Sequence, residues 1–552
     1  MTRRRRLADR APSGLLLVLV ATWVVWYPPS PDLAAQVFRV HLFTADGFSL
    51  WDNNWYGGHY LPSYSLLLPA LAAFAGLRAL GALSALVSVW AFSRLSRRSE
   101  LARPNAARAV FALSVAGDLF IGRITFALGV AIGLLALLAS THGSARSRML
   151  TGCLSLACAA ASPVAAIFLA LGACADFCVS RRATRALALG APALLLTGAF
   201  AVLLPEGGYE PFALSSLLAA GGASLCVLLL APATQRLLHA TFALYLLVLL
   251  GCYVVPSPVG SNVVRFGVLF APAMLIGCVA IGNVQARVAS LIALARRVGR
   301  VRRTRSYRAA ELRSGIASSM LASCIALMLG WQLTGPLSQS VGASLSPSSR
   351  ASFYQPVIRY VERADGARPV RIEVPFTSSH WDAAVLGAHF LLARGWERQL
   401  DTRYDALFYG PSLSASAYRG WLLANGVSYV ALSDAPLDFS SVQEAALIRT
   451  GLPFLRLALR TAHWRIYEVR GAQALVSGPG SVRALNGDGF SIAARRSGRF
   501  LVRVHYTPYW AVVSGAATLG PATGGWTEVY VAHPGTIVVD AEFSLGALSG
   551  AG

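Results

Sequence analysis

The segment FTADGFSLWDNNWYGGHYLPSY, residues 43–64, lies between two strongly hydrophobic parts of the chain and differs from both in composition. It combines aspartates, asparagines and a histidine with a glycine pair and several tryptophans and tyrosines. Glycine and proline punctuate it, so we expect an irregular backbone. Carboxylates near hydrocarbon cost free energy unless protein or water surrounds them, and by default they indicate a functional site.

The composition of the whole chain predicts a polytopic membrane protein. Of its 552 residues, 55% are hydrophobic and only 13% are charged, whereas a soluble protein carries about 25% charged residues. The net charge of +23 comes from 48 basic residues that are all arginine. These arginines form short clusters between apolar runs, as membrane orientation signals do, and they outline no basic face for nucleic acid.

Hydropathy predicts about eleven transmembrane helices. The arginine clusters alternate so that the amino terminus lies in the cytoplasm, and the first span is retained because no small-residue cleavage site follows it. This topology places a long loop, residues 31–76, and the tail after residue 335 on the extracytoplasmic side of an inner or plasma membrane. The predicted spans are 13–30, 77–95, 107–121, 124–141, 149–162, 163–179, 186–204, 213–231, 236–255, 265–284 and 315–335.

The tail changes in composition and predicts two further domains. Segments rich in branched and aromatic residues, such as GVSYVALSD (426–434) and WTEVYVAHPGTIVVDAEF (526–543), are typical of β-strands. Helical patterns at 349–363 and 382–394 occur only before about residue 470. We therefore expect a transmembrane domain over 1–335, an α+β module over 336–470 and a β-sandwich-like module over 471–552.

The cysteines predict neither a disulfide framework nor a zinc site, because all eight lie in apolar segments without neighbouring histidines. The absence of lysine removes the side chain that a phosphate-binding P-loop or a Schiff base requires. No cofactor is indicated, and a divalent metal stays open.

Three aspartates of the long loop are candidate catalytic bases: Asp32, Asp46 and Asp52. Asp32 follows PPSP and precedes an amphipathic stretch that ends at Phe43, so capping of a helix explains it as well as catalysis does. Four aromatic side chains of the loop could stack on a sugar or form an interfacial belt, and their spacing with two glycines and His59 favours a site. These aromatic residues are Trp51, Trp55, Tyr56 and Tyr60.

Two arginines outside this loop are candidates for binding a phosphate. Arg265 starts the tenth predicted span, three residues after Asn262 in PSPVGSNVVRFG (256–267), and its planar guanidinium suits a lipid phosphate. Arg123 lies in a short turn after Asp118, where an ion pair that anchors a helical hairpin explains it equally well.

With its long first outer loop LWDNNWYGGHYLPSYSLLLPAL (50–71), about eleven spans and an extracytoplasmic tail, the chain resembles the GT-C superfamily of polyprenyl-phosphate-sugar glycosyltransferases. The loop is most similar to bacterial membrane proteins described as 6-pyruvoyl-tetrahydropterin-synthase-related, and VRVHYTPYWAVVSG (502–515) resembles their closing strand.

The resemblance implies an inverting hexosyl- or pentosyltransferase. Its partners would be a polyprenyl-phosphate-linked sugar donor, a cell-envelope glycan or lipid acceptor and the surrounding membrane lipid, with no nucleic acid. It also implies a carboxylate that removes the proton of an acceptor hydroxyl, for which Asp32 matches by position and Asp46 and Asp52 are rivals. Arg39 and His41 stand roughly where relatives have histidine.

Two other classes of function remain open. A lipid or solute transporter or flippase would share the spans, but it would show two pseudo-symmetric halves with discontinuous helices, which hydropathy does not indicate. A non-catalytic GT-C-like scaffold would keep the fold and lose the acid in the cavity.

Overall fold

The computed structural model describes residues 3–99, 101–279, 308–411 and 413–544. The chain forms two compact units, and each is assembled from three separate stretches. The first unit contains residues 1–27, 78–198 and 210–339, and the second contains residues 28–77, 199–209 and 340–552. The long loop that sequence analysis grouped with the transmembrane domain therefore shares a compact unit with the tail.

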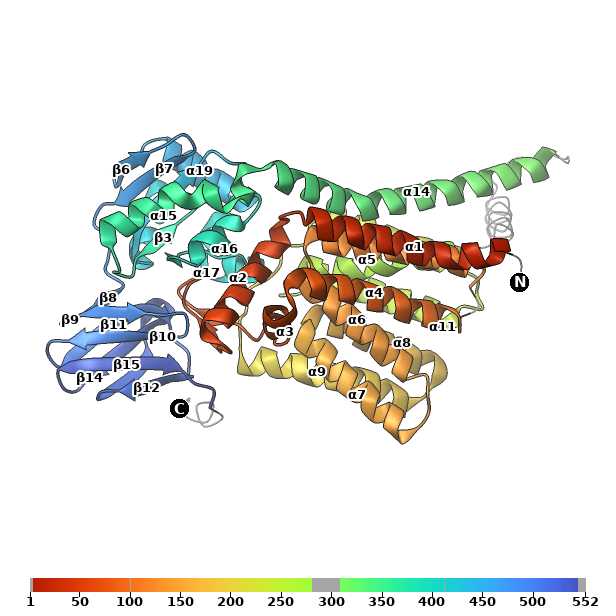
Figure 1. Cartoon of the computed structure of the whole chain (residues 1–552), viewed down its shortest axis with the longest axis horizontal. Helices are drawn as coiled ribbons and strands as arrows, with labels where there is room; N and C mark the ends of the chain where they lie inside the picture. Colours follow the sequence, from red (N-terminus) through yellow and green to blue (C-terminus); the bar gives the residue numbers. More distant parts are fainter. Residues whose placement is uncertain (1–2, 100, 280–307, 412, 545–552) are drawn as a thin grey trace. The chain divides into compact units, whose positions relative to one another are not determined.

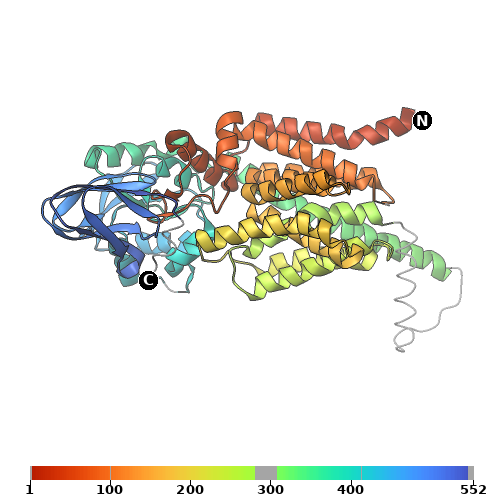
Figure 2. The same cartoon turned by 90° about the horizontal axis from the view of Figure 1, so that it is seen from below.

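The first unit is helical, and a helix overlaps every predicted span. Neighbouring helices run alongside one another, with α1 against α5, α5 against α12 and α6 against α7 (Figures 1 and 2). The described helices are α1 (Arg3–Trp26), α4 (Leu77–Ser96), α5 (Pro104–Ile121), α6 (Ile124–Ala139), α7 (Ala145–Ala161), α8 (Pro163–Ser180), α9 (Ala183–Leu203), α10 (Leu214–Leu230), α11 (Arg236–Val254), the 3₁₀ turn η1 (Gly260–Val263), α12 (Val264–Cys278) and α14 (Arg308–Leu345).

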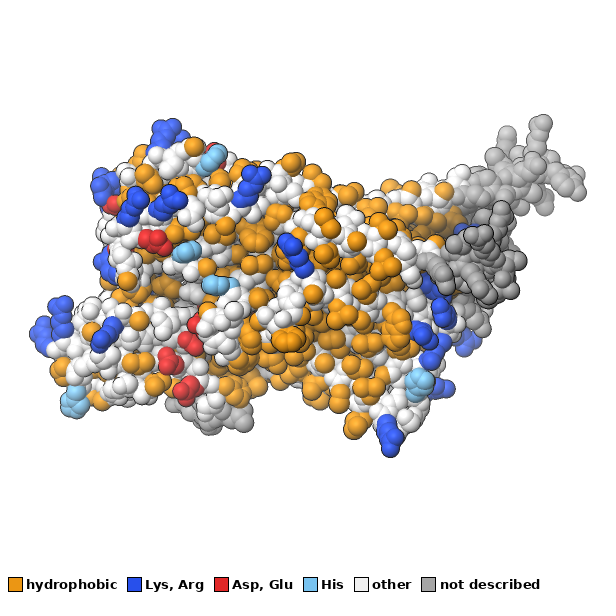
Figure 3. All heavy atoms as spheres, in the orientation of Figure 1, with side chains coloured by type: hydrophobic (Ala, Val, Ile, Leu, Met, Phe, Trp, Pro, Cys, Tyr) orange, Lys and Arg blue, Asp and Glu red, His pale blue; other side chains and the backbone are white. Residues whose placement is uncertain are grey.

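Six of the described helices are long and apolar enough to cross a membrane, or seven if α1 and the helix after it form one bent span. Hydrophobic side chains cover much of the visible face of the helical unit in Figure 3. The chain is thus a multi-pass membrane protein by the length and composition of its helices, but the expected count of about eleven spans is not confirmed. Helices such as α6, with 16 residues, are shorter than the ~20 residues that a straight span requires.

Small residues let these helices approach closely. A Cβ placed on Gly129 of α6 would lie 2.6 Å from the Cβ of Ser162, directly before α8, and one on Gly190 of α9 would lie 3.2 Å from the Cβ of Ala173 in α8. In lipid, helices gain no hydrophobic free energy from associating with each other. Close approach stabilises their packing through van der Waals contacts instead.

The loop contributes four elements to the second unit. They are α2 (Pro31–Asp46), the short strands β1 (Trp51–Asp52) and β2 (His59–Tyr60), which pair in antiparallel fashion, and α3 (Leu68–Ala75). The turn between the strands has positive φ at Tyr56, Gly57 and Gly58. A Cβ on Gly58 would lie 2.3 Å from the ring of Trp51, so glycine is required there.

An α+β module follows in the tail. Its five-stranded sheet has the order β4-β3-β5-β7-β6, in which β3 is parallel to β4 and β5 and the other pairs are antiparallel. The predicted helix 349–363 is α15 (Ala351–Asp365), whereas 382–394 is helical only over α16 (Trp381–Gly387) and then becomes strand. The other elements are β3 (Arg371–Glu373), β4 (Leu391–Leu392), α17 (Arg398–Tyr404), α18 (Ala415–Ala424), β5 (Val427–Ser433), η4 (Phe439–Ser441), α19 (Val442–Arg449), β6 (Leu455–Arg460) and β7 (Trp464–Val469).

The last module consists of two four-stranded antiparallel sheets, with orders β12-β15-β10-β9 and β13-β14-β11-β8. Apolar residues of both sheets enter one core, for example Phe500 and Val502 of β11 from one sheet and Ile492 of β10 and Ile537 of β15 from the other. The strands are β8 (Val476–Ser477), β9 (Gly480–Leu485), β10 (Gly489–Ala494), β11 (Gly498–His505), β12 (Trp510–Ser514), β13 (Ala517–Pro521), β14 (Trp526–Val531) and β15 (Gly535–Ala541).

Candidate functional site

The aromatic residues of the loop pack inside the second unit. Trp55 is fully buried, stacks on Phe38 at 4.2 Å and donates a hydrogen bond from Nε1 to the carbonyl of Ala383. The hydroxyl of Tyr56, also buried, donates to the carbonyl of Gly395 at 2.6 Å. Both aromatic side chains are therefore structural contacts between the loop and the α+β module.

Trp51 makes the equivalent connection to the β-sandwich. Its ring meets Trp510 edge-on at 5.7 Å, and its Nε1 donates to Oδ1 of Asn53. Asn53 in turn donates from Nδ2 to the carbonyl of Asn486, and its backbone N–H donates to the carbonyl of Gly487. The hairpin of the loop is thus held against strands that lie more than 400 residues away in sequence.

Asp52 and His59 face each other on this buried hairpin. Nδ1 of His59 lies 3.7 Å from Oδ2 of Asp52, and both side chains are almost fully buried. Burial raises the pKa of Asp52 to about 7, against the opposing hydrogen bond from the backbone N–H of Asn54. Burial, with the charge of Arg39, lowers the pKa of His59 to about 3. Near neutral pH the pair therefore tends toward its uncharged form.

Arg39 lies inside the second unit and has a partner there. Its guanidinium pairs with the carboxylate of Glu397, and both side chains are nearly buried. The same guanidinium lies 4.0 Å from the ring centroid of Tyr64. The pair with Glu397 connects α2 to the tail, and the contact with Tyr64 connects α2 to the rest of the loop.

Asp32 lies in the first turn of α2, where a carboxylate stabilises the helix through the helix dipole. Asp32 is not the N-cap residue that the sequence suggested. The helix already begins at Pro31, and Ser30 is its N-cap residue.

His41 and Asp46 have a different environment, because both line an open groove of about 420 Å³. One wall is the last part of α2 with Asn54 of the hairpin, and the other walls come from the end of α15 and from the segment that joins α16 to β4. Figure 3 shows acidic and histidine side chains on the visible surface of the second unit. The polar residues that line the groove are His41, Asp46, Asn54, Glu362, Arg368 and His389.

The carboxylates of Asp46 and Asp52 approach the same point. A Cβ placed on Gly487 would lie 3.7 Å from Oδ2 of Asp46, 3.6 Å from Oδ1 of Asp52 and 3.8 Å from Nδ2 of Asn54. Asp46 is exposed to the groove, whereas Asp52 is buried behind it. Of the three predicted carboxylates, Asp46 is the one that a ligand in the groove can touch directly.

The predicted phosphate-binding residues lie in the first unit. Arg123 directly precedes α6, and its Nη1 is 3.7 Å from Oδ1 of Asp118. The guanidinium of Arg265 lies 5.5 Å from the ring of Phe126 in the first turn of α6. The two arginines therefore lie at the amino end of one helix. Asn262 belongs to η1, the turn before α12, which carries Arg265.

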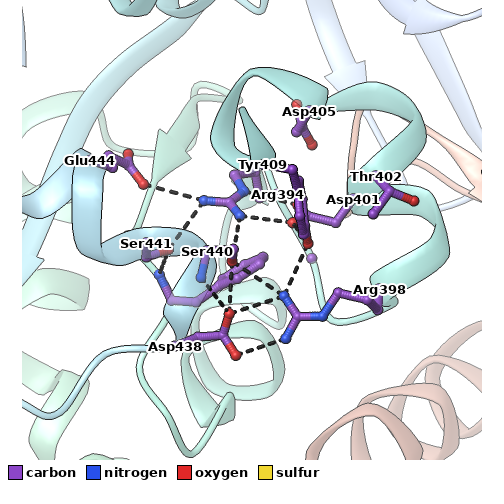
Figure 4. Close-up of polar contacts among 12 residues, drawn as sticks. Arg394, Arg398, Asp401, Thr402, Asp405, Tyr409, Asp438, Ser440, Ser441 and Glu444 are labelled. Atoms are coloured by element: carbon purple, nitrogen blue, oxygen red, sulfur yellow. Dashed lines mark hydrogen bonds and ion pairs between the residues drawn. The ribbon is translucent and has the colours of Figure 1, made fainter. Parts of the chain in front are cut away.

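A buried network of charged residues surrounds Arg394 in the tail, and the sequence did not indicate it (Figure 4). Nη2 of Arg394 lies 2.8 Å from Oδ2 of Asp401, and its Nη1 lies 3.2 Å from Oε2 of Glu444. Nearby, Arg398 pairs with Asp438 at 2.7 Å. A buried arginine among several carboxylates ties α17, η4 and α19 to the sheet, and we assign it to the folding of the module.

The other residues of the groove were also missed, because nothing in the local sequence distinguishes them. Glu362 and Arg368 flank the end of a helix with an ordinary amphipathic pattern, and His389 follows a short helix. Only the fold brings them to the loop. Within the described residues, no group of three or more histidine, cysteine, aspartate or glutamate side chains is arranged to hold a metal ion.

Comparison with protein-family models and with curated proteins finds no match for this chain.

Proposed function

We propose that this protein is an integral membrane glycosyltransferase of the GT-C type with about eleven spans. In this proposal it transfers a sugar from a polyprenyl-phosphate donor to a glycan or lipid acceptor of the cell envelope. The amino terminus is cytoplasmic, and the second unit lies on the extracytoplasmic side. One observation carries the proposal: the carboxylate of Asp46 is exposed and lines a groove, in a protein that also has several apolar helices long enough to span a membrane.

The proposed reaction inverts the anomeric carbon of the donor sugar. The carboxylate of Asp46 accepts the proton of an acceptor hydroxyl as its oxygen bonds to the anomeric carbon. The bond between that carbon and the phosphate oxygen breaks on the opposite side, and the polyprenyl phosphate leaves as an anion. Within the first unit, the guanidinium groups of Arg123 and Arg265 lie near the amino end of α6, and guanidinium donors and a helix amino terminus both favour an anion such as a phosphate.

The carboxylate is tested by Asp→Asn variants of Asp32, Asp46 and Asp52, which keep shape and remove the base. We expect Asp46→Asn to lower transfer roughly 100-fold or more, in line with general-base contributions, while donor binding persists. Asp434→Asn is the matched control, because Asp434 is an exposed carboxylate outside the groove that pairs with His463. Full transfer by all three variants, separately and together, would show that the mechanism is wrong.

The leaving-group site is tested separately with Arg265→Ala. A charge-assisted hydrogen bond contributes roughly 1.5 to 3 kcal/mol, so donor affinity should fall about tenfold or more while the melting temperature changes little. Arg94→Ala is a suitable control, since Arg94 lies over the ring of Trp90 in α4. If the variant loses stability but binds donor normally, Arg265 has a structural role.

The burial of Asp52, Trp55 and Tyr56 favours a second candidate, a non-catalytic envelope scaffold. These side chains bind the loop to the tail whether or not any reaction occurs. A purified protein that binds no polyprenyl-phosphate sugar under any condition would favour this candidate over the transferase.

A further inference from the structure

We propose that the groove beside Asp46 is the acceptor site and that it binds an uncharged glycan through the hydroxyls of its sugars. This inference rests on the proposed transferase and specifies its substrate class. It concerns the surface between α2, α15 and the segment that joins α16 to β4.

The size and construction of the groove suit a small ligand. Its volume of about 420 Å³ falls within the roughly 300–1,000 Å³ of small-molecule sites. Its lining comes from stretches of chain more than 300 residues apart, which the shared core of Phe38, Trp55 and Val357 fixes against each other. The site is therefore part of the folded unit and not a gap between loose segments.

The polar side chains of the groove match hydroxyl groups. Asp46 and Glu362 accept hydrogen bonds, and Asn54 can donate and accept them. Nδ1 of His389 lies 3.5 Å from Oε1 of Glu362. A sugar hydroxyl both donates and accepts, so a lining with both capacities can satisfy it. Apolar surface between these groups, from Phe390 among others, can cover the C–H face of a sugar ring.

The charges of the groove disfavour an anionic acceptor. The guanidinium of Arg368, the arginine in the lining, already pairs with Asp365. Glu362 likewise lies beside His389, at 3.5 Å, and the carboxylate of Asp46 would repel a phosphate or a uronate, because like charges placed together are unfavourable. A neutral sugar meets no such penalty.

The position of Asp46 adds an independent argument. It is the last residue of α2, where a carboxylate is disfavoured by the negative end of the helix dipole. A role in binding a ligand in the groove explains why an aspartate occupies this unfavourable position, whereas packing does not.

The experiment uses the full-length chain in detergent and measures the binding of neutral linear tetrasaccharides and of their phosphate-bearing counterparts. At least one neutral tetrasaccharide should bind, and every phosphorylated counterpart should bind more weakly. Glu362→Gln and His389→Ala should each raise the dissociation constant of the neutral ligand several-fold to tenfold. Asp434→Asn should leave it unchanged.

The inference is overturned if no neutral tetrasaccharide binds at millimolar concentration, if the phosphorylated ligands bind more tightly, or if the groove variants bind like the unmodified protein. Transfer assays on the same samples separate the two proposals. Binding that depends on the groove without any transfer would support the glycan site and count against the transferase. Transfer that is indifferent to Glu362 and His389 would overturn the acceptor site alone.

Discussion

Single buried residues explain much of the unusual composition of the loop. Oδ2 of Asp52 has no hydrogen-bond partner among the described residues. Neither ring nitrogen of His59 has one there either. Burial shifts the pKa of each toward its neutral form, up to about 7 for Asp52 and down to about 3 for His59. The positive charge of Arg39 opposes the raised pKa of Asp52, and the negative charge of Asp46 adds to it. The polar residues of the hairpin therefore make its stability depend on pH.

Asp52→Asn should stabilise the protein at neutral pH and have less effect in acid. The pKa of Asp52 is higher in the folded than in the unfolded protein, so the native carboxyl loses stability as pH rises from about 4 toward 7. Asparagine cannot ionise, and its advantage over the native residue should grow by roughly 2 to 3 kcal/mol between pH 5 and pH 7. Thermal unfolding in detergent at both pH values measures this difference. A constant difference would contradict the shifted pKa.

At the scale of elements, α2 behaves as a helix of the tail domain. Besides the pair of Arg39 with Glu397, two indoles hold its start: Nε1 of Trp381 donates to the carbonyl of Pro29, and Nε1 of Trp396 donates to that of Pro31. The apolar side of α2 enters the same core as α15, through Phe38 and its neighbours. The amphipathic pattern of this helix is visible in the sequence, but the surface that it contacts is not.

Glu397→Gln should destabilise the second unit strongly. It leaves the buried guanidinium of Arg39 without a counter-charge, and breaking such a pair costs roughly 3 to 5 kcal/mol. The double variant Arg39→Met with Glu397→Gln should recover much of this loss, because no uncompensated charge remains. Arg456→Met, which removes an exposed pair with Glu468, should change the unfolding midpoint little. Equal effects of the buried and exposed changes would refute the argument.

At the scale of the whole molecule, the second unit depends on chain segments from both ends of the sequence. Trp55 and Tyr56 belong to a core with the α+β module, whereas Trp51 and Tyr60 belong to a core with the β-sandwich. Neither core can form from the loop alone.

Two truncated chains should separate these contributions in limited proteolysis with chymotrypsin. A chain that ends at residue 339 lacks both cores, so the loop should be cut rapidly at Trp51, Trp55 and Tyr56. A chain that ends at residue 470 keeps the first core, so cutting should concentrate at Trp51 and spare Trp55. Resistance of the loop in the shorter chain, equal to that in the full-length protein, would show that the tail does not stabilise it.

The regular elements could be predicted because their signals are local. An apolar run of sufficient length predicts a helix near the observed one, as at α11, and alternating branched residues predict β5 and β14. Short apolar helices limit this accuracy, because length and hydropathy alone do not separate a span from a packed helix. The change from helix to strand after Gly387 was missed because parallel pairing of β4 with β3 decides it.

The candidate site was predictable only in part, for the same reason. The loop residues were found by composition, since acids and aromatics beside apolar helices are unusual in any sequence. The sequence could not separate Asp46, which faces a groove, from Asp52 and Trp55, which are buried, because burial depends on contacts with residues more than 300 positions away.

The sequence by itself determined that this chain is a multi-pass membrane protein with a β-rich tail, because hydropathy and side-chain alternation act over short distances. Only the tertiary structure decided that the loop and the tail share their cores. It also decided that His41 and Asp46 line a groove with Glu362 and His389. The physical reason is that long-range packing removes some polar groups from water and leaves others exposed, and no local pattern specifies which.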